Sequence, residues 1–306
     1  MPDRNGQLLL ERCLTLLLLL AGCGHTPRPE QPTDFSAYLE ARRAQYLALT
    51  PSVQDGDGYV DTDHCDSVLH TALLGAGEVG IENMAAARSL TGQWFRRPLT
   101  YDECLASGQS RSSFSRDMVT GLLWYWYTAR DWRAAEQFYA YAGEHNLKIG
   151  DSDGTIEGLS RVFMSPDLMA LLAEVIYRTG GPNHLATRNL ATRHSPDVVG
   201  FLAHTEVLQA ILWRQLTGRY SKSESAAIAN HVARRPENAL FQYAAGNRDE
   251  AARLLLTQHP EGRLPTSADF CNPLRYESEE TGPCDEGRTH APIEFMAISY
   301  WLIYEK

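Results

Sequence analysis

Segments with helical periodicity recur along the chain in pairs, and this pairing limits the possible folds more than any other feature. A strongly apolar segment is usually followed by a short connection, an amphipathic segment and then a long polar loop. An apolar helix is typical of a buried position, and an amphipathic helix is typical of a position with one wet face. The periodicity predicts helices over residues 34 to 49, 65 to 74, 82 to 90, 117 to 129, 132 to 145, 167 to 178, 182 to 192, 197 to 216, 223 to 234, 237 to 245, 249 to 259 and 292 to 304.

Strand signals are scarce, and residues 94 to 97 and 161 to 164 are the only short candidates. We therefore predict an all-α domain. Six apolar helices would take inner positions, each with an amphipathic outer partner, and the helix near residue 34 would pair with the last one. This arrangement resembles the six-hairpin (α/α)6 toroid of many carbohydrate-active enzymes. The alternative is an open α-solenoid, because residues 131 to 145 and 246 to 256 are similar to tetratricopeptide hairpins, although no regular repeat spacing recurs.

The N-terminus carries a targeting signal. An apolar run over residues 13 to 22 is too short to span a membrane and is typical of a signal peptide. It ends in Leu20-Ala21-Gly22-Cys23, which resembles a bacterial lipobox. The resemblance implies a signal peptide over residues 1 to 22, lipidation with palmitate at Cys23 and, because Gly24 follows, a lipid anchor on the periplasmic face of the outer membrane. Residues 23 to 33 form a Pro-rich tether to a domain over residues 34 to 306. A plain secretory signal or a short hydrophobic anchor are the alternatives.

Cysteine usage agrees with export. Besides Cys13 and Cys23 the chain has four cysteines, an even number that favours disulfides in an oxidising compartment. We favour the pairs Cys65–Cys104 and Cys271–Cys284, because each pair brackets one irregular polar segment. Four free buried thiols are the alternative.

Composition and charge exclude several classes of protein. The 43% apolar content argues against intrinsic disorder. A net charge of −10 removes general attraction to nucleic acid, so we expect no nucleic-acid partner. The expected partners are the membrane, through the lipid anchor, and a glycan substrate; the oligomeric state is left open.

Two clusters carry the candidate catalytic residues. In a toroid the long loops before the inner helices gather on one face, and a scaffold with its polar loops at one end usually works at that end. Asp66 and His70 lie four residues apart on one helix, so they share a face. Arg116 and Asp117 open the most aromatic helix, which continues through residues 124 to 127. Two carboxylates can divide acid and base roles, and aromatic rings bind the apolar faces of sugars.

Further polar loops supply candidate substrate-binding residues. The segment 92 to 98 resembles a substrate-facing loop of sugar-processing toroids and holds Trp94 and Arg96. Other loops on the same predicted face supply Arg111, Asp153 and Arg161. Each candidate has a structural alternative. Acids in a first helical turn interact favourably with the helix dipole, His70 suits a core position, and the aromatic run suits a core.

No cofactor and no metal ion is expected. Gly75 to Gly80 matches G-x-G-x-x-G, but the segment before it is helical and not a strand, so it is interpreted as a helix stop and a turn. The acidic loop over residues 55 to 66 lacks the glycine and the final glutamate of a calcium loop.

The functional prediction is an exported lipoprotein that acts on a glycan, as a glycoside hydrolase or as a lyase. In a lyase, His70 or a Tyr would take the proton and Arg116 would neutralise a uronate. The alternative is a non-catalytic envelope lipoprotein whose helices form a protein-binding scaffold, so whether the chain is an enzyme is left open. A glycan enzyme predicts acids and aromatics converging in one cleft, whereas a scaffold predicts scattered acids and an exposed apolar groove.

Overall fold

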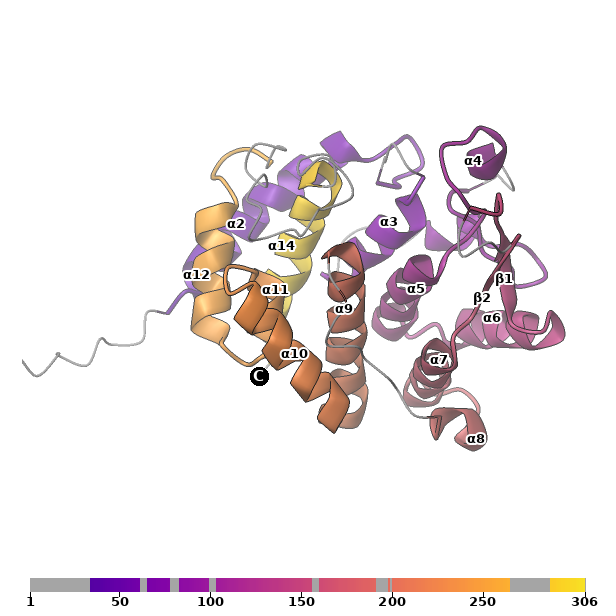
Figure 1. The fold of residues 1–306 in the computed structure, drawn as a ribbon. Helices are drawn as coiled ribbons and strands as arrows, with labels where there is room; N and C mark the ends of the chain where they lie inside the picture. Colours follow the sequence, from indigo (N-terminus) through magenta and orange to yellow (C-terminus); the bar gives the residue numbers. More distant parts are fainter. Residues whose placement is uncertain are drawn as a thin grey trace, which may run out of the picture. The chain divides into compact units, whose positions relative to one another are not determined.

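A computed structural model describes residues 34–60, 65–77, 83–98, 103–155, 160–190, 198, 200–264 and 287–305. These residues are mostly helical, and the sheet among them has two strands, so the predicted all-α class is confirmed (Figure 1). Contacts divide the chain after Asp34, and the elements named below belong to the unit Phe35–Lys306. Within the described ranges, no helix has the length and apolar character that crossing a membrane requires.

The helices begin at recognisable signals. Pro166 occupies the first turn of α7, where its missing N–H costs nothing. Ser221 and Glu224 form a capping box at the start of α10. The bounds are α2 (Ser36–Leu49), η1 (Thr50–Val53), α3 (Ser67–Ala76), η2 (Met84–Ala87), α4 (Glu103–Ala106), α5 (Arg116–Ala129), α6 (Trp132–Glu144), α7 (Pro166–Arg178), α8 (Leu185–Arg188), α9 (Gly200–Thr217), α10 (Lys222–Arg234), α11 (Ala239–Ala244), α12 (Arg248–Gln258) and α14 (Gly287–Tyr304), with β1 (Lys148–Asp151) and β2 (Arg161–Phe163).

The apolar helices pack mainly on one another. Helix α3, in which every residue is buried, contacts both α5 and α14. Helix α5 also contacts α7, and α9 lies against α5, α7, α10 and α11 (Figure 1). Helix α11 contacts α14 in turn. The amphipathic helices cover this set: α6 lies against α5 and α7, and α2 and α12 lie against α14.

Large aromatic side chains fill the space between these helices. Trp124 of α5 stacks on Trp301 of α14, with ring centroids 4.8 Å apart. Trp126 contacts Trp94 and Phe138 through ring centroids 5.8 and 5.5 Å apart. All four tryptophans are fully buried, so each removes a large apolar area from water and contributes strongly to stability.

Two glycines allow close approach of helices. A Cβ placed on Gly121 of α5 would lie 2.9 Å from the carbonyl oxygen and 3.0 Å from the Cα of Leu69 in α3. A Cβ on Gly77, just after α3, would lie 2.7 Å from the carbonyl oxygen of Met296 in α14. Any larger residue at these points would push the helices apart, so the glycines set the spacing of α3 from its two neighbours.

Two predicted helices are shorter than expected. Residues 82 to 90 were expected to be helical, but among those described only η2 is, because a tight turn follows it: Ser89 N donates to Gln93 O at 2.8 Å and Gly92 has φ +91°. Of residues 182 to 192, only the single turn α8 is helical in the described part. At both places the local turn residues prevail over a weak helical pattern.

The small sheet also corrects the strand predictions. The candidate at residues 161 to 164 is confirmed as β2, but residues 94 to 97 are irregular and Trp94 makes only an isolated bridge with Arg88. Strand β1 was not predicted, since its four residues carry no alternation; it forms by antiparallel pairing with β2. A further bridge joins Ser152 to Ser112, which ties the hairpin to the loop that leads into α5.

Candidate functional site

Asp66 lies at the start of α3, where Arg96 holds its side chain. Asp66 is the N-cap residue of α3, but its carboxylate accepts no capping hydrogen bond from the helix. Its Oδ1 instead forms an ion pair with Nη1 of Arg96, and the Asp66 side chain stays 26% exposed. An adjacent guanidinium favours the charged form of a carboxylate. The structure therefore presents Asp66 as a fixed, negatively charged group that is still in contact with solvent.

Arg96 itself lies beneath Asp66, away from solvent. Its side chain is only 8% exposed, and it donates from Nε to the carbonyl oxygen of Ser112 at 2.6 Å and from Nη2 to Ser112 Oγ at 2.8 Å. The sequence predicts Arg96 as a substrate-binding residue. These contacts occupy its guanidinium within the protein, so its place in the site is behind Asp66.

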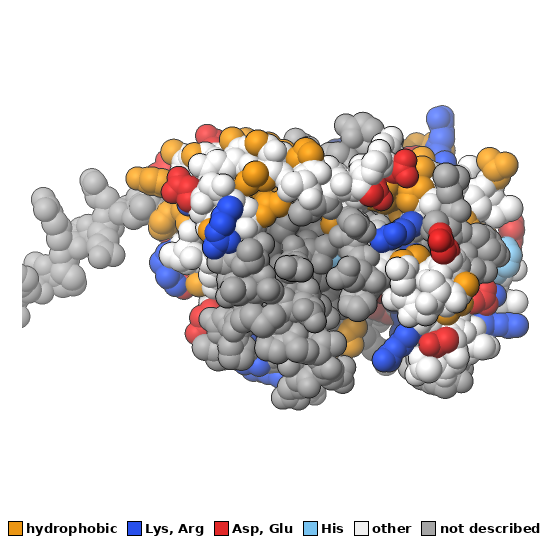
Figure 2. Space-filling view, turned by 90° about the horizontal axis from the view of Figure 1, so that it is seen from above, with side chains coloured by type: hydrophobic (Ala, Val, Ile, Leu, Met, Phe, Trp, Pro, Cys, Tyr) orange, Lys and Arg blue, Asp and Glu red, His pale blue; other side chains and the backbone are white. Residues whose placement is uncertain are grey.

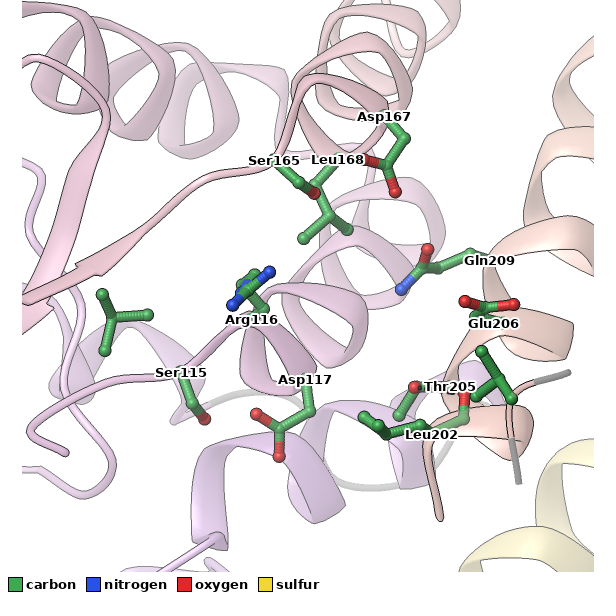
Figure 3. A pocket seen from close by; sticks show the side chains of 12 residues that line it. Ser115, Arg116, Asp117, Ser165, Asp167, Leu168, Leu202, Thr205, Glu206 and Gln209 are labelled. Carbon is green, nitrogen blue, oxygen red and sulfur yellow. Dashed lines mark hydrogen bonds between the residues drawn. The ribbon is translucent and has the colours of Figure 1, made fainter. Parts of the chain in front are cut away.

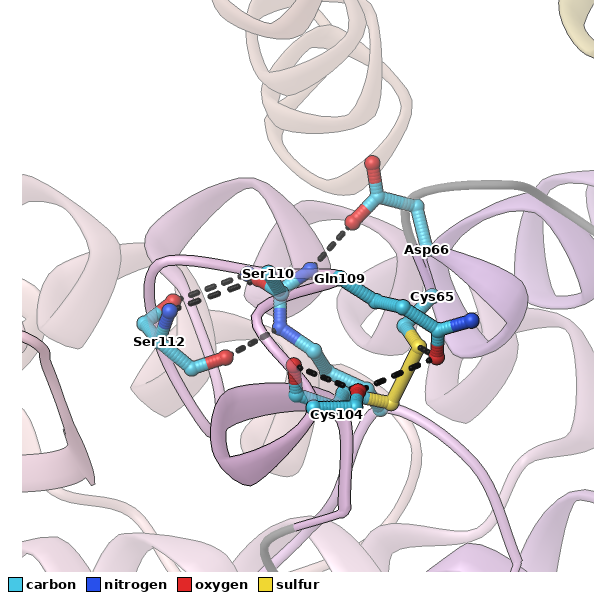
Figure 4. The surroundings of a disulfide bond; sticks show 8 residues. Cys65, Asp66, Cys104, Gln109, Ser110 and Ser112 are labelled. Carbon is cyan, nitrogen blue, oxygen red and sulfur yellow. Dashed lines mark hydrogen bonds and ion pairs between the residues drawn. A yellow bond between two sulfur atoms is a disulfide. The ribbon is translucent and has the colours of Figure 1, made fainter.

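A disulfide closes this region. Cys65, immediately before Asp66, is bonded to Cys104 of α4, with the two Cα atoms 6.1 Å apart (Figure 4). Cys65 has φ +59°, a left-handed conformation that residues other than glycine adopt at some cost. The bond thus anchors the backbone at the turn that leads into Asp66. The second favoured pair, Cys271–Cys284, lies outside the described residues.

We expect Cys65 and Cys104 to be unreactive in the oxidised protein. Thiol titration of the unfolded, unreduced chain, followed by peptide mapping, should find neither as a free thiol. Cys104→Ser should lower the free energy of unfolding by about 2–4 kcal/mol, because the bond restricts the unfolded chain. A Cys104→Ser variant as stable as the wild type would contradict this expectation.

Asp117, in the first turn of α5, is the second carboxyl of the site. Burial raises its pKa above the ordinary 3.8, and the negative charge of Asp66 raises it further, while a hydrogen bond from Ser115 and the charge of Arg96 act in the opposite direction. The two carboxyls are therefore close enough to influence each other, although they come from different helices. The environment of Asp117 therefore favours its protonated form.

Asp117 also lines a pocket of about 500 Å³ between the starts of three helices. Figure 3 shows Arg116 and Asp117 on α5, Asp167 and Leu168 on α7, and Thr205, Glu206 and Gln209 on α9. One part of the lining is aliphatic, and it includes Leu202, which is 62% exposed. The described lining consists of Ser115, Arg116, Asp117, Val162, Ser165, Asp167, Leu168, Val198, Leu202, Thr205, Glu206 and Gln209.

Six polar residues of this lining were not among the predicted site residues: Ser115, Ser165, Asp167, Thr205, Glu206 and Gln209. Asp167 is an acid in the first turn of α7, directly after Pro166. Glu206 and Gln209 lie three residues apart in α9, a spacing that puts them on one face of a helix. Gln209 Nε2 donates to Thr120 Oγ1 of α5 at 2.8 Å, which orients its amide beside the pocket. The helical pattern alone did not show which face of α9 meets α5.

The predicted cationic and loop residues divide into two groups. Arg116 lines the pocket beside Asp117. Arg111, Asp153 and Arg161 are exposed and lie around the β1–β2 hairpin: Asp153 N donates to Arg111 O at 3.0 Å, and Arg161 pairs with Asp151 in the sheet. Bonds from Thr155 lower the pKa of Asp153, so it is ionised. None of these three is among the described residues that line the pocket.

His70 is buried inside α3. Burial lowers its pKa to about 3, so the imidazole is neutral at physiological pH. Its spacing from Asp66 is the expected helical one, but the His70 side chain is buried in the protein core. This placement suits a core histidine better than one that exchanges protons with solvent.

The aromatic residues stay in the core. Trp94 is fully buried and edge-on to Tyr125 and Trp126, so its ring has no surface to offer a ligand. Residues 124 to 126 are buried as well, and Tyr127 packs on the core. No described residue that lines the pocket is aromatic. Of the two predicted catalytic acids, Asp117 lines the pocket, whereas Asp66, whose charge acts on Asp117, is not among the described lining residues.

Among the described residues, charge and metal-binding patterns add no second site. On the face shown in Figure 2, acidic and basic side chains of the described residues are interspersed. Among the side chains that the structure describes, no group of three His, Cys, Asp or Glu residues is arranged to hold a metal ion. Comparison with protein-family models, with curated proteins and with solved structures found no match to this chain.

Proposed function

We propose that this protein is an exported lipoprotein that hydrolyses a glycan, with Asp117 as the general acid and Asp66 as the ionised partner. The single observation that carries the proposal is the contrast between the two carboxyls. Asp66 is paired with Arg96, whereas burial and the charge of Asp66 raise the pKa of Asp117. Two carboxyls whose environments separate their protonation states are the usual arrangement for acid and base roles.

The pocket supports this assignment. Asp117 lines it, and a protonated carboxyl there would meet the glycosidic oxygen of a bound sugar. Thr205, Glu206 and Gln209 supply hydrogen-bonding groups for hydroxyls, and Val162, Leu168 and Leu202 supply an apolar surface. Asp66 would act as nucleophile if its carboxyl stands about 5–5.5 Å from that of Asp117, and as base on a water at about 6.5–9.5 Å.

We also propose that the helices close a six-hairpin toroid. Helix contacts support the idea, because they run from α3 to α5, α7, α9, α11 and α14 and return to α3. Helices η2, α6, α8, α10, α12 and α2 contact this set from the side. Such an arrangement brings the first turns of α5 and α7 to one end, where Asp117 and Asp167 lie.

The lyase reading has less support than hydrolysis. Its proton acceptor would be His70 or a tyrosine, and the imidazole of His70 is buried in α3 with a pKa of about 3. Arg116 does line the pocket, so a uronate remains a substrate to include in any screen. A non-catalytic scaffold is the remaining alternative.

A glycan screen tests the proposed activity. The full chain is incubated with neutral oligosaccharides, uronate polymers and cell-wall glycan, and the products are read by mass spectrometry. Gain of one water per cleavage indicates hydrolysis, and an unsaturated product indicates elimination. Absence of cleavage across all three classes, together with capture of a defined protein partner, would favour the scaffold.

Lipidation is proposed at Cys23, on the LAGC sequence at residues 20 to 23, which lies outside the described residues. We expect the membrane-extracted protein to begin at Cys23, to carry acyl chains there and to lack residues 1 to 22. Mass spectrometry of the N-terminal peptide checks this expectation. Cys23→Ala should block processing, and an unmodified Cys23 in the wild type would contradict it.

A further inference from the structure

Arg96 connects the two segments that carry the candidate carboxyls. Its main-chain carbonyl accepts a hydrogen bond from Val68 N, in the first turn of α3, at 3.0 Å. Its guanidinium reaches Asp66 through Nη1 and Ser112 through Nε and Nη2. Three of its nitrogen atoms thus have an assigned protein partner, which fixes the guanidinium in one orientation.

Ser112 is fixed as well. Its residue bridges to Ser152 next to the β1–β2 hairpin, and it is fully buried. The loop that carries it begins at α4, where Cys104 is bonded to Cys65. The disulfide, the Asp66–Arg96 ion pair and the Arg96–Ser112 hydrogen bonds therefore link the segment at Cys65 to the segment that follows Cys104. Figure 4 shows the disulfide and the contacts of Ser112 and Asp66.

We propose that Arg96 is a positioning residue that keeps Asp66 ionised and fixed, so that the proton available to the pair resides on Asp117. The catalytic consequence rests on the proposed function, whereas the assignment of the proton does not. Arg96 is not among the described residues that line the pocket, so its proposed effect on a substrate passes through Asp66. A guanidinium clamped by two further hydrogen bonds keeps its charge beside one carboxylate better than a mobile ammonium group does.

An ion pair joins Asp66 to Arg96, and other charged groups lie around the two carboxyls. Asp66 faces Arg96 from the loop after η2 and Asp117 from α5, and His70 on its own helix is neutral. Asp117 faces Asp66 and Arg96, with Arg116 beside it on α5 and with Asp167 and Glu206 lining the same pocket from α7 and α9. Of α14, which packs on α3, Met296 lies beside Gly77, at the opposite end of α3 from Asp66.

Carboxyl titration by NMR tests the proposal without any need for activity. The full chain is labelled with ¹³C at the aspartate carboxyls, and Asp66→Asn and Asp117→Asn assign the two signals. In the wild type, Asp66 should titrate at least about one pH unit below Asp117, since a nearby guanidinium typically shifts a carboxyl by about 1–3 units. The opposite order, or equal midpoints, would overturn the proposal.

Two substitutions separate charge from geometry. Arg96→Gln should raise the Asp66 midpoint by about one pH unit or more. Arg96→Lys keeps the positive charge but lacks the planar set of guanidinium donors, so it should raise the midpoint less. Arg253→Gln, which removes a guanidinium from an exposed ion pair with Glu250 on α12, is the matched control and should leave both midpoints unchanged. Circular dichroism confirms that each variant is folded.

The outcomes distinguish this inference from the proposed function. If Arg96→Gln shifts the midpoint of Asp66 but no glycan is cleaved by the wild type, the positioning role stands and the hydrolase proposal fails. If glycan is cleaved, Arg96→Gln should move the acid limb of the pH–rate profile upward with the Asp66 midpoint. If the Asp66 midpoint stays within about 0.3 units in a folded Arg96→Gln variant, Arg96 does not have this role.

Discussion

Replacement of Asp117 by Asn is expected to lower glycan-cleaving turnover by about 10²–10⁴-fold, the usual contribution of a general acid. An amide of the same shape cannot donate a proton to a leaving oxygen. Turnover of the substrate identified in the glycan screen, measured at its optimal pH, gives the size of the loss. A rate within threefold of the wild type would show that Asp117 is not the acid.

The same substitution should not destabilise the protein. Burial, followed by the charge of Asp66, raises the pKa of Asp117 above 3.8, so the folded chain holds this proton to higher pH than the unfolded chain does. By linkage, this carboxyl lowers the free energy of unfolding as the pH rises from its unfolded pKa to its folded pKa. Above the folded pKa the full cost of the charged form is present. A neutral Asn avoids the cost, so Asp117→Asn should gain stability relative to the wild type from pH 4 to pH 8.

Asp249→Asn is the matched control. Asp249 is also an acid in the first turn of a helix, α12, but it is exposed and lies outside the pocket. Its loss should leave turnover unchanged and cost about 0.3–1 kcal/mol, through the helix dipole. Thermal unfolding of both variants at the two pH values completes the comparison. If Asp117→Asn loses stability as Asp249→Asn does, and activity falls only in proportion, Asp117 has a structural role alone.

Replacement of Gly121 by Ala is the second large effect. Its Cβ would lie 2.9 Å from the carbonyl oxygen of Leu69, a main-chain atom that cannot rotate away. Helix α5 must therefore move from α3, which we expect to cost about 1–3 kcal/mol of unfolding free energy. The movement also separates Asp117 from Asp66. The NMR midpoint of Asp117 should therefore fall, because the part of its shift that comes from the charge of Asp66 becomes smaller.

Gly143→Ala is the control for the glycine effect. Gly143 lies in α6, and no heavy atom stands within 4 Å of a Cβ built on it. Ala is a better helix former than Gly by about 1 kcal/mol, so this variant should be slightly more stable than the wild type. Chemical denaturation of both variants measures the difference, and a Gly121→Ala variant as stable as Gly143→Ala would show that α3 and α5 are not held by this contact.

The sequence determined the features that depend on local order. Apolar periodicity of 3.6 residues predicted the long helices α2, α5, α6, α7, α9, α10 and α14, because a helix presents one face at that period. Cysteine number and spacing pointed to the Cys65–Cys104 pair that the structure contains. The pattern failed at η2 and α8, where turn residues shorten weak helices, and at β1, which forms only because β2 lies beside it.

The tertiary structure decided what each candidate side chain can do. Asp66 and Asp117 were both visible in the sequence as acids at helix starts, but their mutual influence depends on how closely α3 and α5 approach at Gly121. Trp94 is buried and Arg96 lies behind Asp66, while Asp167, Glu206 and Gln209 reach the pocket from other helices. Helical periodicity acts along one chain segment, whereas burial and electrostatic fields act through space between segments, and only the assembled helices bring those groups together.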